Sequence, residues 1–108
     1  MATDPNNSPE AWVRASVVHS HEGRYAEAMA ACDHALQLHH SYALAYALKG
    51  AALTRLNRFD EALACSDHAL ALDPTFVSAW NNKGVILRAL CRVGEAEMAE
   101  QRAQVLGE

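Results

Sequence analysis

The sequence is poor in aromatic residues and carries little net charge. Aromatic side chains make up 6% of the 108 residues, whereas 51% are hydrophobic and many of these are alanine. This composition favours closely packed helices over a sheet. The formal net charge of −4 argues against a nucleic-acid-binding domain, which usually carries a basic face. A chain of this length suits one domain.

Long apolar runs and paired cysteines are also missing. No apolar run reaches the roughly 18 residues that cross a bilayer, and MATDPNNSPEAW has no signal-peptide pattern. We therefore expect a soluble, cytoplasmic protein that binds no membrane. Cys32, Cys65 and Cys91 form no CxxC motif, so neither a disulfide framework nor a thiolate zinc site is indicated. We expect them to be small buried apolar thiols.

What the sequence does contain is a repeat of 34 residues. DHALQLHHSYALAYALKG, which starts at Asp33, and DHALALDPTFVSAWNNKG, which starts at Asp67, share their first four and last two letters. Three series coincide at this spacing: Trp12, Tyr46 and Trp80; Ala28, Ala62 and Ala96; Ala35, Ala69 and Ala103. We divide the chain into copies at 9–42, 43–76 and 77–108, after a leader, 1–8, that we expect to be flexible.

Each copy divides into two helical stretches separated by a break at HEGR, LNR or LCR. Apolar residues of the second copy recur every three to four positions, which predicts six helices of roughly 14 residues and no strands. Gly50 and Gly84 in the first helices face alanines in the second helices. Small residues there would let the two backbones approach closely.

The pattern W-x2-[LK]-G-x2-[YL], then G-x-Y-x2-A, then A-L-x-L-x-P, resembles the tetratricopeptide repeat family over 9–108. The resemblance implies an all-α, right-handed superhelical solenoid of three helix-turn-helix repeats. Lys49 and Lys83 replace a common leucine, which is similar to the bacterial and archaeal variety. The first copy departs from the family at Ser16, His19 and His40, so we expect it to be weaker locally. The matching positions of copy two are Tyr46, Gly50, Leu53, Phe59, Ala62, Ala69 and Pro74.

In this family the first helices line a concave groove, so the resemblance implies a protein-interaction scaffold that binds a peptide or helix of a partner there. The first helices of copies two and three contain Lys49, Arg55, Lys83 and Arg88 and no acid. This predicts a mildly basic groove for an acidic or C-terminal peptide, unless the charges only keep the helices soluble. The implied groove residues are Val13, Val17, His21, Ala47, Ala51, Arg55, Asn81, Asn82, Val85 and Arg88.

The family's chaperone-tail binders hold a terminal carboxylate with lysines, asparagines and an arginine at set groove positions. In this chain those positions read Val13, Val17, Leu48, Ser78 and Asn82. Only Asn82 is polar in a related way. We therefore do not expect a clamp for a chaperone tail.

Six histidines raise the question of metal binding or catalysis. His19 and His21 project roughly 200° apart on a helix, and so cannot chelate one ion together. His34 and His68 occupy one repeat position on different helices, where we expect a solvated convex face. No nucleophile has a sequence-level base and orienting group, and there is no phosphate-binding loop. We expect no metal, no cofactor and no enzyme activity; the competing hypothesis predicts a chelator-sensitive melting temperature.

The third copy differs from the others on one helix face. Leu63, Ser66 and Leu70 of copy two become Glu97, Glu100 and Gln104. A face that packs on the next repeat in a solenoid has turned polar, which predicts that the array ends here as a complete three-repeat protein.

The junction between copies one and two lacks a strong stop signal. Copy two ends its second helix with Asp73-Pro74, whereas His39-His40-Ser41 contains neither proline nor glycine. We expect packing of Tyr42 to enforce a turn, with Ser41 as a candidate cap. The alternative is a self-assembly module that forms a homo-oligomer through exposed faces or exchanged helices. One such route is a fused helix and a domain-swapped dimer around His39–Ser41. Monomer and homodimer both stay open.

Overall fold

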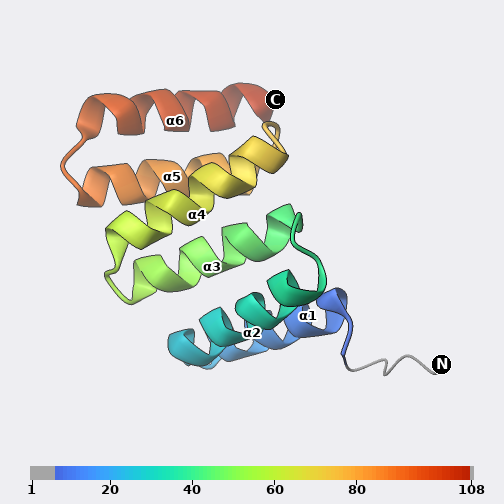
Figure 1. The fold of residues 1–108 in the computed structure, drawn as a ribbon. Helices are drawn as coiled ribbons and strands as arrows, with labels where there is room; N and C mark the ends of the chain where they lie inside the picture. Colours follow the sequence, from blue (N-terminus) through green and yellow to red (C-terminus); the bar gives the residue numbers. More distant parts are fainter. Residues whose placement is uncertain (1–6, 108) are drawn as a thin grey trace.

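The computed structural model describes residues 7–107, which fold as an all-α solenoid of three helix-turn-helix repeats, as predicted (Figure 1). No strand occurs among these residues. Equivalent helices begin 34 residues apart. None of the described helices is long and apolar enough to span a membrane. The helices are α1 (Pro9–His21), α2 (Tyr25–Leu38), α3 (Ala43–Arg55), α4 (Phe59–Leu72), α5 (Val77–Ala89) and α6 (Val93–Leu106).

The three helix pairs stack in sequence order, so that α1 and α2 lie at one end of the array and α5 and α6 at the other (Figure 1). The first helices, α1, α3 and α5, contact one another in succession. The second helices, α2, α4 and α6, contact first helices but not each other. The array therefore curves with the first helices on its inner side and with grooves between the second helices on its outer side.

Alanine and glycine bring the two helices of each repeat together. Ala28, Ala62 and Ala96 are fully buried at one repeat position, and Ala35 and Ala69 at another. A Cβ atom on Gly50 would lie 3.3 Å from the Ala62 carbonyl oxygen, which is tighter than an ordinary van der Waals contact. The helices are thus in backbone contact distance, and a larger side chain at these positions would separate them.

Ser16 occupies the position of Gly50 in the first repeat. Its hydroxyl shares a hydrogen bond of 3.1 Å with the Cys32 thiol, and both side chains are completely buried. A buried hydroxyl without a partner costs free energy, and this contact supplies the partner. The departure from glycine is therefore compensated by Cys32 on the facing helix.

The N-terminus of α1 is held by residues that the sequence assigned to a flexible leader. The Ser8 hydroxyl accepts a hydrogen bond from the Ala11 amide at 3.1 Å, and Pro9 is the first helical residue. The Trp12 indole donates to the Asn7 side-chain oxygen at 3.0 Å. Asn7 and Ser8 therefore belong to the fold. The rest of that leader, 1–6, lies outside the described residues.

The turn between α2 and α3 forms without proline or glycine. His39 has φ −145° and ψ 94°, and Asp73, at the same position of the next repeat, has φ −142° and ψ 91°. The His39 ring stacks on Tyr42, which packs on the core. Ser41 is not the cap, because Tyr42 occupies the N-cap position and no side chain makes the cap hydrogen bond. In this single chain α2 and α3 are separate helices, as expected from the packing of Tyr42. A domain-swapped dimer and self-assembly stay predictions.

The turns inside the repeats all require one left-handed residue. Gly23 has φ +76°, and Asn57 and Cys91 have φ +60° at the equivalent positions. Glycine adopts this region freely and asparagine tolerates it, whereas for other residues the left-handed conformation costs about 1–2 kcal/mol. Cys91 is the residue least suited to its turn.

Replacing Cys91 with the residue of the second repeat should therefore stabilise the protein. We expect Cys91→Asn to raise the free energy of unfolding by about 0.5–1 kcal/mol, measured by urea denaturation. Cys91→Ala is the control, because it removes the thiol but keeps the cost of the left-handed backbone. Equal stability of the two variants would show that the conformation at this turn is not the cause.

Candidate functional site

Three first-helix residues form a row along the inner side of the array. Val17, Ala51 and Val85 occupy the same position of successive repeats, on α1, α3 and α5. Val17 is 37% exposed and Val85 56% exposed, and Ala51 is half-buried. Arg55 lies exposed one turn beyond Ala51. We call these four residues the first-helix face.

Two of the expected groove residues are not accessible. Val13 is 7% exposed because it packs with Ala35 and Ala45, and Ala47 is 4% exposed because it packs against the following repeat. Asn81, the equivalent residue in the third repeat, is exposed. Val13 and Ala47 therefore belong to the core between repeats. Of the remaining expected groove residues, His21 is exposed and Asn82 is half-buried.

The cations of the first helices do not gather on the first-helix face. Lys49 binds Asp33 of α2 at 2.7 Å, and Lys83 binds Asp67 of α4 at 2.8 Å. Both lysines thus reach toward the second helices. These contacts join a first helix to the second helix of the preceding repeat, and we call them the inter-repeat ion pairs. The two lysines that were expected to make the groove basic are therefore neutralised by aspartates of the second helices.

The two arginines differ in their surroundings. Arg88 donates two hydrogen bonds of 2.7 Å to the Glu100 carboxylate on α6. The guanidinium of Arg55 lies 5.6 Å from the centre of the Tyr25 ring, as a cation–π contact. Among the described residues Arg55 is the one first-helix cation of repeats two and three without a carboxylate partner. The first-helix face is consequently an apolar row with one positive edge.

Lys49 remains charged through the neutral range. Burial of the ammonium lowers the pKa of Lys49, but the hydrogen bond and the charge of Asp33 outweigh burial, so the pKa is raised. A cation whose pKa is raised on folding stabilises the folded state below its ordinary pKa, and this contribution is lost as the pH rises through the raised value. The ion pair is therefore intact at neutral pH.

The polar residues expected on the last repeat lie where α6 has no following helix in the described chain. Glu97 and Gln104 are exposed. The Glu100 side chain covers Gly84, since a Cβ atom there would lie 2.8 Å from the Glu100 Cγ. Its hydrogen bond to Arg88 lowers the pKa of Glu100. Glu100 thus stays ionised and closes the contact between α5 and α6 with an ion pair.

The cysteines and histidines form no reactive arrangement in the part of the chain that the structure describes. Burial raises the pKa of the Cys32 and Cys65 thiols, which keeps them protonated at neutral pH. Cys91 is exposed, unlike the buried thiol that we expected. No three of the described histidine, cysteine and acidic residues are placed to hold a metal ion.

His34 and His68 are exposed, as expected for a solvated face, and each also stacks on an aromatic ring. The His34 ring stacks on Trp12 with centroids 4.3 Å apart, and the His68 ring stacks on Tyr46 at 4.1 Å. In each pair the histidine lies 22 residues after the aromatic residue. Sequence reasoning missed these contacts, although the repeated spacing of aromatic residue and histidine was a signal for them.

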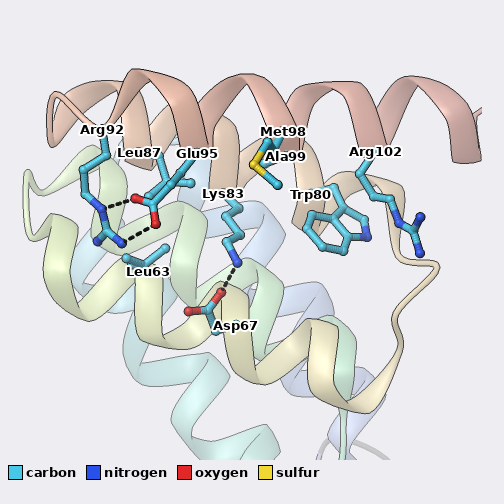
Figure 2. A pocket seen from close by; sticks show the side chains of 10 residues that line it. All are labelled: Leu63, Asp67, Trp80, Lys83, Leu87, Arg92, Glu95, Met98, Ala99 and Arg102. Carbon is cyan, nitrogen blue, oxygen red and sulfur yellow. Dashed lines mark hydrogen bonds and ion pairs between the residues drawn. The ribbon is translucent and has the colours of Figure 1, made fainter.

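The outer side of the array contains two cavities, each of about 390 Å³, that the sequence did not predict. One lies between α2 and α4 and the other between α4 and α6, with α3 or α5 as the floor. An inter-repeat ion pair borders each. Figure 2 shows the second cavity, in which side chains of α4, α5 and α6 converge. We call it the outer groove.

A tetratricopeptide repeat family model matches residues 9–38 and 43–76, and a second such model matches residues 65–101. The chain belongs to the tetratricopeptide repeat (TPR) family. Together these matches include parts of all three helix pairs of this TPR protein. No curated protein matches the chain.

Solved TPR structures share the fold at low sequence identity. The second TPR of Spaghetti (RPAP3), bound to the HSP90 peptide SRMEEVD, has a TM-score of 0.88 at 19% identity and covers 91% of both chains. The TPR domain of Arabidopsis OM64 has a TM-score of 0.89 at 23% identity, over 91% of this chain and 81% of that one. The TPR2B domain of yeast Sti1, in a pHsp70 complex, gives 0.88 at 23%, over 91% and 78%.

The inter-repeat ion pairs should couple neighbouring repeats measurably. In a double-mutant cycle with Asp33→Asn and Lys49→Met, we expect a coupling energy of about 0.5–1 kcal/mol, because both side chains are partly exposed to solvent. The pair Arg58 and Glu61, within one helical turn and more exposed, should give about 0.3 kcal/mol. A coupling for Asp33 and Lys49 no larger than this control would mean that the pair does not join the repeats.

Proposed function

We propose that this TPR protein is an interaction scaffold that binds a helix or extended segment of a partner protein on its first-helix face. The observation that carries the proposal is the row of Val17, Ala51 and Val85. Three apolar residues recur at one repeat position, stay accessible and lie on the inner side of the curve. A repeated apolar row suits an amphipathic or extended segment, which places an apolar residue against each repeat.

The chemistry of the face favours an apolar segment over a terminal carboxylate. The RPAP3 domain that resembles this chain binds a peptide ending in Glu-Val-Asp. At the positions where chaperone-tail binders place their basic residues, this chain has no lysine or arginine, and one of those positions, Val13, is buried. Arg55 supplies a single positive charge at the edge. We therefore propose an apolar ligand with at most one acidic contact.

The test compares the peptide affinity of a variant substituted on the first-helix face with that of a control variant substituted elsewhere. Peptides selected from a displayed random library on the wild-type protein are measured by fluorescence anisotropy against Val17→Glu/Val85→Glu. We expect affinity to fall at least about tenfold, because each carboxylate would be buried against an apolar ligand. Val105→Glu is the control, because the exposed fraction of Val105, 57%, is close to that of Val85, but Val105 lies on α6. It should change affinity less than about twofold.

Circular dichroism should show unchanged helicity in both variants, because all three positions are exposed. The proposal is contradicted if every selected peptide still binds the doubly substituted protein, or if affinity falls equally in the control. Arg55→Glu tests the positive edge and should lower affinity only for peptides that contain an acid. Arg88 is a poor probe, because glutamate there would face Glu100 and disturb the fold.

A further inference from the structure

The outer groove differs from the cavity between α2 and α4 in one respect. The aromatic residue of the first helix lines the outer groove but not the other cavity. Trp80 and Arg102 line the outer groove. Their equivalents, Tyr46 and His68, do not line the cavity between α2 and α4. The reason is that the His68 ring lies flat on Tyr46, with 8° between the planes. Arginine replaces this histidine in the third repeat. The Trp80 ring therefore has no stacked histidine; the Lys83 ammonium lies 5.5 Å from its centre, and the ring borders the outer groove.

The floor and wall of the outer groove are apolar. Leu63 of α4 and Leu87 of α5 line it together with Met98 of α6, whose side chain extends toward the cavity in Figure 2. Met98 is 70% exposed and replaces Ala64 of the preceding repeat. Methionine adapts its shape to apolar ligands. With the Trp80 ring, these side chains form a surface on which a planar apolar group can lie.

One of the cations that line the outer groove has no carboxylate partner among the described residues. Lys83 binds Asp67, and Arg92 binds Glu95. Within residues 7–107, Arg102 has no carboxylate partner. Figure 2 shows its side chain beside Trp80, on the side away from Lys83. A free guanidinium next to an apolar cavity is complementary to a carboxylate, which it can bind through two hydrogen bonds.

We propose that the outer groove binds a segment of a partner protein in which an aromatic residue stands next to an aspartate or glutamate. The aromatic side chain lies against Trp80, Leu87 and Met98, and the carboxylate binds Arg102. A cavity of about 390 Å³ is within the range of natural ligand pockets and accommodates one aromatic side chain. This surface is separate from the first-helix face, on the opposite side of the array.

Binding at the outer groove can be isolated from binding at the first-helix face. A displayed library of random octapeptides is selected on the Val17→Glu/Val85→Glu protein, whose first-helix face is disabled. We expect the enriched peptides to contain Trp, Phe or Tyr within two residues of Asp or Glu. In nuclear magnetic resonance spectra the indole N–H signal of Trp80 should shift on binding. The Trp12 signal should not, because His34 covers that ring.

Substitutions at Arg102 test the charge and the covering of the ring separately. Arg102→Gln should weaken the selected peptides about tenfold through loss of the charged hydrogen bonds. Arg102→His restores the residue of the other two repeats and should abolish binding at all concentrations where the wild type saturates. Arg14→Gln, at an exposed arginine of α1, is the matched control and should leave affinity unchanged.

Three results would overturn the proposal. The first is a selection that enriches no peptide, or only peptides without an acid next to an aromatic residue. The second is an unchanged Trp80 indole signal on binding. The third is a loss of affinity for Arg14→Gln as large as that for Arg102→Gln, since the effect would then be that of net charge alone.

Discussion

Everything else in this fold depends on how closely the two helices of each repeat approach. Two backbones can lie side by side only where neither carries a bulky side chain, and here alanine or glycine occupies those positions. The other side chains that meet there are small: Ser16 faces Cys32, and Gly50 faces Ser66. The contact fixes the angle between paired helices. The aromatic residue of each first helix is consequently held at the same place in every repeat.

Once this contact is fixed, the other positions can differ between repeats without changing the backbone. The inter-repeat ion pairs use the lysines on the outer side, which leaves the inner side apolar. The position 22 residues after the aromatic residue is histidine twice and arginine once. On one scaffold the chain thus has two surfaces of different chemistry, an apolar row inside and an aromatic cavity with a free cation outside.

The sequence predicted the features that depend on one repeat and missed those that depend on two. The 34-residue period, the six helices and the small residues between paired helices follow from spacing alone. The direction of Lys49 and the burial of Ala47 depend on a neighbouring repeat, so the sequence suggested a basic, open groove where the structure has ion pairs and core. The turn after His39 was predicted correctly from the packing of Tyr42, whereas the stacking of His39 on that ring is invisible in the pattern.

The central claim is that one backbone geometry holds the aromatic ring in each repeat and that the residue 22 positions later decides whether a second ring stacks on it. Acrylamide quenching of single-tryptophan variants tests this most directly, with Trp12→Phe leaving Trp80 and Trp80→Phe leaving Trp12. We predict stronger quenching of Trp80, because His34 covers Trp12 whereas Trp80 borders the outer groove. Adding Arg102→His should reduce the quenching of Trp80 to the level of Trp12. Equal quenching of the two tryptophans, or stronger quenching of Trp12, would contradict the account.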